Sequence, residues 1–283
     1  MALTIQNFDS RQKMSKSDFE IFHYREAKLK NVNIHHHDFY EIYFFLGGNV
    51  EYFVDGEKFK LSKGDLLLIN PMQLHQPLTS EGNVYERIVL WIDRNYLSKL
   101  CKDEDLSYCF KKTDDGYVSL LHSNAIMHGR VNELFELLNK EFHSKSFASK
   151  TYSESILVQL LIEINRLVKN KKENKEPNKS ANLVSRVITY INDHYSENIS
   201  LDMLSKKFFI SKYHLSHEFS DKVGVSVYKY LTLKRLLMAK EMLISGYSSS
   251  RVAVECGFHN YTTFYRIFKS HYGTNPATLS IKK

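Results

Sequence analysis

The chain has 283 residues, of which 43% are hydrophobic, enough to bury a core and, at about 100–200 residues per domain, to form two domains. No apolar stretch approaches the ~20 residues of a membrane helix, and the opening "MALTIQNFDSRQK" lacks the apolar core of a secretory signal, so we expect a cytoplasmic protein without a membrane partner. The net charge of +7 falls within residues 181–283, where 14 Lys and Arg accompany 7 Asp and Glu, a balance typical of polyanion-binding domains.

Short apolar segments of strand length fill residues 33–92. They read "YEIYFFL", "VEYFV", "KFKL", "DLLLI" and "YERIVLWI". Turn signals separate them, and Asp55-Gly56 is the strongest two-residue hairpin signal in the chain. Because several segments are apolar on both faces, they favour a closed barrel or sandwich over one half-exposed sheet.

The stretch "HHHDFYEIYFFLGG", residues 35–48, begins with three adjacent histidines. His35, His37 and Glu41 share strand parity, so an extended backbone would turn them to one face. Their spacing resembles the first cupin motif, and His75 in "GDLLLINPMQLHQP" stands near the histidine of the second motif, although the glycine expected after Pro71 is missing. Three histidines and one carboxylate could hold Fe, Mn or Zn.

Two other interpretations of these residues stay open. The polar groups could form a buried framework, or they could line a ligand pocket together with Arg87 and Trp91 of "YERIVLWI". Polar groups for hydroxyls beside flat rings for C–H faces suit a sugar. We expect the pocket, with no metal and no cofactor.

Beyond the strands, the apolar period becomes helical, which predicts helices near 125–170. The first apolar stripe comprises Val131, Leu134, Phe135, Leu138 and Phe142. The second, wider stripe comprises Ile156, Leu157, Leu160, Leu161, Ile164, Leu167 and Val168. The second stripe either packs on the barrel or pairs with its copy in a homodimer.

The segment "KNKKENKEPNKS", residues 169–180, contains no large apolar residue. Such a composition predicts a solvated linker. We therefore expect a first domain at 1–168, a linker at 169–180 and a second domain at 181–283.

The second domain contains an internal repeat. Ser211, Leu215, Phe219, Gly224 and Ser226 recur 49 residues later as Asn260, Phe264, Phe268, Gly273 and Asn275. Each copy describes a helix with a capping residue, a buried stripe and a glycine stop. A shorter predicted helix precedes each copy, so the pattern is a helix-turn-helix present twice. The pattern at 227–245 predicts one long helix between them, spanning roughly 28 Å, near the ~34 Å between successive major-groove faces.

The run "VAVECGFHNYTTFYRIFKSHYGTNPATL" resembles the C-terminal signature of the AraC/XylS family of bacterial transcription regulators. Gly257-Phe258, Phe264, Arg266, Phe268-Lys269, Gly273 and Pro276 stand where that family has them. The resemblance implies an α+β fold with an N-terminal cupin-like effector barrel, dimerisation helices and a C-terminal all-α domain. It also implies a regulator, an activator rather than an enzyme, whose partners are promoter DNA, RNA polymerase and a small-molecule effector.

Positions early on the two repeated helices should contact DNA. On the first helix these are Lys212, Tyr213, Ser216 and His217, and on the second they are Tyr261, Thr262, Tyr265, Arg266 and Lys269. Arg266 suits a bidentate contact to guanine, whereas Lys269 suits phosphate. The first helix departs from the family in having His217 and Ser220 in place of basic residues and in adding Glu218, which predicts weaker binding by that half.

We expect the effector to be a sugar or oligosaccharide. The alternatives are a metal-dependent cupin enzyme with an appended DNA anchor, or the same regulator sensing a fatty acid or host cue. An apolar pocket without convergent polar groups would favour the fatty acid.

Overall fold

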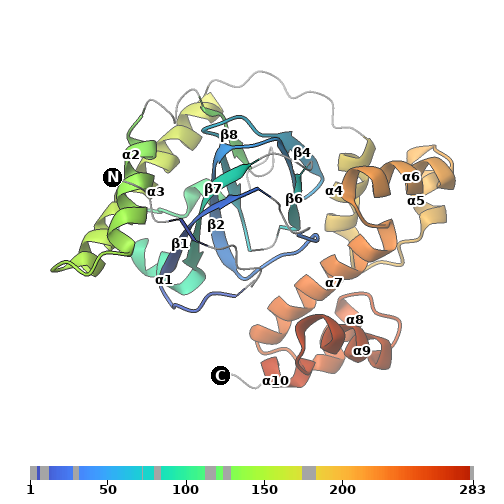
Figure 1. The fold of residues 1–283 in the computed structure, drawn as a ribbon. Helices are drawn as coiled ribbons and strands as arrows, with labels where there is room; N and C mark the ends of the chain where they lie inside the picture. The colour runs from blue at the N-terminus through green and yellow to red at the C-terminus, as the bar shows by residue number, and fades with distance from the viewer. Residues whose placement is uncertain are drawn as a thin grey trace. The chain divides into compact units, whose positions relative to one another are not determined.

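The structure is a computed structural model that describes residues 5–6, 13–27, 32–71, 73–79, 84–111, 119–123, 129–173 and 183–280. The chain divides into two compact units, with the boundary between residues 178 and 179. The first unit is rich in strands and the second is helical (Figure 1). None of the helices in the described ranges is both long and apolar enough to cross a membrane.

The first unit contains two antiparallel β-sheets. A five-stranded sheet has the order β1-β7-β2-β5-β8, and a three-stranded sheet has the order β4-β3-β6. The strands are β1 (Phe19–Glu26), β2 (Phe39–Gly47), β3 (Val50–Val54), β4 (Glu57–Lys60), β5 (Leu66–Ile69), β6 (His75–Thr79), β7 (Tyr85–Asp93) and β8 (Leu120–Leu121). The five expected strand segments are confirmed as β2, β3, β4, β5 and β7, and β1, β6 and β8 are additional.

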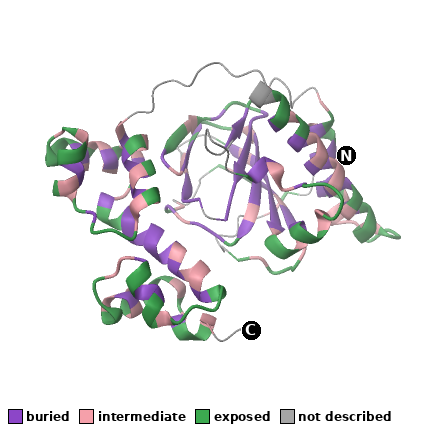
Figure 2. Ribbon diagram, turned by 180° about the vertical axis from the view of Figure 1, so that it is seen from behind, coloured by how far each residue is buried: buried purple, intermediate pink, exposed green. Residues whose placement is uncertain are grey.

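The five-stranded sheet is buried on both faces (Figure 2). In β2, Ile42 and Phe44 join the core that includes the helices, whereas Tyr43 and Phe45 join the core shared with the three-stranded sheet. This explains why the strand segments are apolar at nearly every position. The hairpin expected at Asp55-Gly56 joins β3 to β4, with φ of 46° and 108° at its two residues.

The helices α1 (Arg94–Leu100), α2 (Arg130–Phe142) and α3 (Ser149–Glu173), with the short 3-10 turn η1 (Tyr108–Phe110), complete the first unit. The α2 and α3 stripes pack in the core on the outer face of the sheet, where the rings of Phe135 and Phe44 lie 4.9 Å apart. The wide stripe of α3 is buried in this same core, where α3 packs mainly against α2.

The predicted linker begins too early. Helix α3 continues through Glu173, so the first five residues assigned to the linker are helical, while 174–180 lie outside the described residues. Lys and Glu are good helix formers, so a charged composition does not by itself end a helix.

The second unit is built of α4 (Leu183–His194), α5 (Leu201–Phe208), α6 (Lys212–Val223), α7 (Val227–Ile244), α8 (Ser249–Glu255), α9 (Tyr261–Tyr272) and α10 (Pro276–Ser280). The predicted repeat is confirmed as α5–α6 and α8–α9. Ser211 Oγ accepts from the backbone N–H of His214, and Asn260 Oδ1 accepts from that of Thr263.

The second helix of each copy, α6 or α9, hereafter called a recognition helix, ends at its predicted glycine. Gly224 and Gly273 adopt φ of 77° and 69°, a conformation that glycine reaches without strain. Helix α7 packs against both copies. Its Tyr230 contacts Phe219 of the first copy, and its Leu236 shares a hydrophobic core with Phe264 and Phe268 of the second.

Candidate functional sites

Three of the predicted polar residues converge inside the first unit. Ligand atoms of His37, Glu41 and His75 all lie within 4.8 Å of one another, and all three side chains are buried. Glu41 lies on β2 and His75 opens β6, while His37 precedes β2. His35 stands beside this group, with its ring centroid 4.3 Å from that of His75.

Backbone pairing, rather than strand parity alone, brings the histidines together. His35 and His75 form an isolated antiparallel bridge, in which each backbone N–H donates to the other's carbonyl oxygen at 3.1 and 2.9 Å. Strand parity required an extended backbone from His35 to Glu41, but β2 begins only at Phe39, after a bend at Asp38. The sequence predicted that these side chains converge, but for an incomplete reason.

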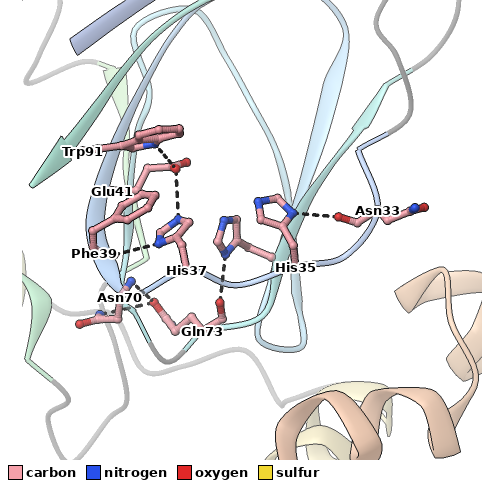
Figure 3. A network of polar contacts seen from close by, with 9 residues as sticks. Asn33, His35, His37, Phe39, Glu41, Asn70, Gln73 and Trp91 are labelled. Atoms are coloured by element: carbon pink, nitrogen blue, oxygen red, sulfur yellow. Dashed lines mark hydrogen bonds and ion pairs between the residues drawn. The ribbon is translucent and has the colours of Figure 1, made fainter. Parts of the chain in front are cut away.

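All three histidines have one ring nitrogen fixed by the backbone; Figure 3 labels His35 and His37 with their partners Asn33 and Phe39. The Nδ1 atoms of His35, His37 and His75 donate to the carbonyl oxygens of Asn33, Phe39 and Gln73, at 2.8, 2.8 and 3.0 Å. A carbonyl oxygen can only accept, so in each neutral imidazole the lone pair is on Nε2. His37 Nε2 lies 3.2 Å from Glu41 Oε2.

Burial shapes the ionisation of this group. Burial and the neighbouring His37 lower the pKa of His35 from 6.5 to about 4. Burial also lowers the pKa of His75 well below its ordinary value, and His35 and His37 act in the same direction. For Glu41, burial raises the pKa, but hydrogen bonds from His37 and Trp91 and the neighbouring histidines outweigh burial and lower it overall.

Trp91 and Arg87 extend the polar wall along β7. Trp91 Nε1 donates to Glu41 Oε2 at 2.8 Å (Figure 3). Arg87 is buried, pairs with Glu26 at 3.1 Å, and holds its guanidinium over the rings of Tyr24 and Tyr85 at 4.9 and 4.1 Å. Both residues share the odd-numbered face of β7 with Val89, as expected from parity.

A cavity of about 50 Å³ opens between the two sheets at this wall. Four of the predicted residues, His35, Glu41, Arg87 and Trp91, line it, whereas His37 and His75 do not belong to its lining. The remaining described lining residues are Tyr24, Val32, Tyr43, Tyr52, Pro77, Tyr85 and Val89. Small-molecule pockets usually measure about 300–1,000 Å³, so in this conformation the space admits only a much smaller occupant.

The four lining tyrosines were not singled out from the sequence. Tyr43 and Tyr85 bring their hydroxyl groups into contact, and Tyr52 stacks near His75 with ring centroids 6.3 Å apart. Burial raises the pKa of Tyr52 well above its ordinary value and also raises that of Tyr85. For Tyr43 and Tyr85, strand parity with Glu41 and with Arg87 was the available signal, because alternate residues of a strand share a face.

The recognition helices of the second unit present the predicted residues outward. Tyr213 is 80% exposed and Tyr261 41% exposed, whereas Leu215 and Phe264 are fully buried. Exposed residues also include Lys212, His217, Thr262, Arg266 and Lys269, while Ser216 and Tyr265 are half-buried. The Tyr265 hydroxyl donates to Asn275 Oδ1 at 2.8 Å.

The two recognition helices differ in how their charges are paired. On α6, Lys212 lies 2.5 Å from Asp202, and Glu218 lies 2.7 Å from Lys222 and 3.1 Å from His214. On α9, Arg266 and Lys269 form no ion pair with any residue that the structure describes, and Lys269 lies 5.9 Å from the ring centroid of Tyr265. The negative charge of Glu218, the acidic residue in which α6 departs from the family, is therefore paired with side chains of the same helix.

Comparison with known families matches both units. Residues 20–107 match a model described as an AraC-like ligand binding domain, and residues 204–280 match one described as a helix-turn-helix domain. The HTH-type transcriptional regulator YbfI of Bacillus subtilis is 23% identical over 239 residues, which cover 84% of this chain and 83% of YbfI.

Two further relatives extend this comparison. The HTH-type transcriptional activator RhaS of Salmonella typhimurium is 23% identical over 244 residues, which cover 86% of this chain and 85% of RhaS. Among solved structures, ToxT of Vibrio cholerae with a bound unsaturated fatty acid is 15% identical, with a TM-score of 0.39 over 94% of this chain and 96% of ToxT.

Proposed function

The chain belongs to the AraC family of DNA-binding transcription regulators, and we propose that it is an activator whose first unit binds a sugar or oligosaccharide. Its family identity is that of a regulator and not of an enzyme. The second unit, residues 181–283, would bind promoter DNA through α6 and α9.

The observation that carries the DNA-binding part is the pair of capped, outward-facing helices. Each begins at a side-chain cap, buries its apolar stripe and leaves its first turns exposed. Exposed N-terminal turns are what helix-turn-helix proteins place against base edges. We propose Lys212, Tyr213, Ser216 and His217 as the contacts of the first helix, and Tyr261, Thr262, Tyr265, Arg266 and Lys269 as those of the second.

The polar character of the cavity supports a carbohydrate effector. Glu41, His35 and Arg87 converge on a space walled by tyrosines and Trp91, which combines hydrogen-bonding groups for hydroxyls with rings for C–H faces. A fatty acid would instead need an apolar wall. Because the space measures about 50 Å³, a sugar must displace lining side chains, and a ligand that selects a widened barrel can shift the regulator between two states.

Two partners and a cellular compartment complete the proposal. An activator acts on RNA polymerase, and a regulator of bacterial promoters acts in the cytoplasm. The apolar stripe of α3 is used within the first unit, so support for a homodimer comes from exposed apolar side chains near the α2–α3 connection, with Phe147 101% and Tyr152 47% exposed.

A sugar panel tests the effector. The purified full chain would be bound to fluorescent DNA from its own upstream region, and the dissociation constant measured with and without each sugar. We expect one sugar to change that constant at least about fivefold, the lower end of usual coupling between sites. Arg87→Met should abolish the response without abolishing DNA binding. Indifference to every sugar, with response to a fatty acid, would contradict the carbohydrate proposal.

A further inference from the structure

We propose that His37, Glu41 and His75 bind one divalent transition-metal ion of the Zn²⁺ or Fe²⁺ class inside the barrel. Their ligand atoms lie within 4.8 Å of one another in a buried position. Two imidazoles and one carboxylate form a donor set that zinc and non-haem iron both accept, with room for a further ligand. The proposal concerns binding and attributes no catalysis to the ion.

The hydrogen bonds of the two histidines are those of metal ligands. Metal-binding histidines usually donate their other ring N–H to a carbonyl or carboxylate, which fixes the tautomer and the ring orientation. Here Nδ1 of His37 donates to Phe39 O at 2.8 Å, and Nδ1 of His75 donates to Gln73 O at 3.0 Å. These backbone bonds occupy both Nδ1 atoms and leave both Nε2 atoms for a metal ion.

His75 places an unsatisfied ring nitrogen next to the buried carboxylate of Glu41. His75 is fully buried, and its Nε2 has no hydrogen-bond partner among the residues that the structure describes. His37 Nε2 lies 3.2 Å from the Glu41 carboxylate and satisfies it only while that nitrogen carries a proton. An unsatisfied buried acceptor beside a buried carboxylate is costly, and a cation bound among the three groups removes both costs.

The cavity beside the group matches a small occupant. It opens onto Glu41 and His35 and measures about 50 Å³, which is comparable to one or two water molecules at roughly 30 Å³ each. A metal ion with its remaining water ligands has this scale, whereas a sugar does not. Only the regulatory role of the ion rests on the proposed function: a bound ion would offer its open position to the hydroxyl groups of an effector.

Tryptophan fluorescence can report on metal binding at this site. Its single tryptophan, Trp91, donates to Glu41 at 2.8 Å, so a change at Glu41 should alter indole emission. The full chain would be stripped with a chelator and titrated with Zn²⁺, and with Co²⁺ as a quenching ion, in the absence of DNA and sugar. We expect one equivalent to bind, with a saturating emission change and a higher melting temperature.

Variants separate this site from adventitious binding. Glu41→Gln keeps the side-chain size and an acceptor for Trp91, and it should weaken Zn²⁺ binding at least about tenfold; His75→Gln should do the same. The control is His194→Ala, which removes an exposed histidine 2.8 Å from Glu197 and should change nothing.

Two results would overturn the metal site: no stoichiometric ion in the unchanged chain, or undiminished binding in both Glu41→Gln and His75→Gln. Because the titration needs neither DNA nor effector, its failure leaves the regulator standing. Conversely, a chain that binds metal but not promoter DNA would refute the proposed function alone.

Discussion

The two helix-turn-helix units share one architecture but present different surfaces. Both recognition helices have a side-chain cap, two buried apolar residues four apart and a left-handed glycine stop. On α6 the basic residue Lys212 is paired with Asp202, whereas on α9 Arg266 and Lys269 have no ionic partner within the described residues. The two copies thus share the residues that fold the helix and differ in their exposed charges. We therefore expect α9 to supply more of the specific DNA contact.

The largest effect should come from the buried phenylalanines that both helix-turn-helix units have. Phe219→Ala and Phe264→Ala each empty a fully buried position, and each should lower the free energy of unfolding by about 3–5 kcal/mol. Urea denaturation followed by circular dichroism measures this. If Phe219→Ala cost less than about 1 kcal/mol, the first copy would not be packed like the second.

The next largest effect compares the exposed faces of α9 and α6 in DNA discrimination. Arg266→Ala should cost about 1–3 kcal/mol of discrimination for the specific sequence, because a bidentate contact to guanine carries that much. His217→Ala, the matched change on α6, should cost clearly less. Fluorescence anisotropy with specific and altered DNA gives both values, and equal losses would remove the asymmetry between the helices.

A smaller effect is expected from phosphate contacts. Lys269→Ala should weaken binding about equally for all sequences and reduce the steepness of the salt dependence by about one. The slope of log K against log salt concentration checks this. A change in sequence preference without a change in slope would mean that Lys269 reads bases instead.

The smallest effect tests the paired charge on α6. Asp202→Asn removes the carboxylate that holds Lys212 at 2.5 Å and frees this amine for phosphate. The salt slope should then steepen by up to about one, while Asp202→Asn combined with Lys212→Ala should not steepen it. No change in the single variant would show that Lys212 does not approach the DNA.

Local patterns predicted the second unit better than the first. Capping residues, apolar stripes and glycine stops all lie within or next to a single helix. The repeat therefore predicted the positions of α6 and α9 correctly, and it predicted that Leu215 is buried while Tyr213 is exposed. In the first unit, strand β6 was not predicted from the sequence. Pro77 argues against a strand in general, but β6 lies at a sheet edge, where proline is tolerated.

The polar group of the barrel depends on contacts that are distant in sequence. Parity predicted that Glu41 faces the same side as the histidines, but the bridge between His35 and His75 joins residues that no local pattern connects. The size of the cavity follows from how Tyr43, Tyr52 and Tyr85 pack across two sheets. Such packing is a tertiary property and cannot be obtained from composition or period.

The most direct test of the account is the ratio of dissociation constants for upstream DNA and for a base-scrambled duplex, measured at one salt concentration. For the unchanged chain we predict a ratio of at least about 10³, the lower end for specific regulators. Arg266→Ala should reduce this ratio roughly 5- to 150-fold, which corresponds to about 1–3 kcal/mol. A ratio near one, or a ratio that Arg266→Ala leaves unchanged, would contradict sequence reading by the second helix-turn-helix unit.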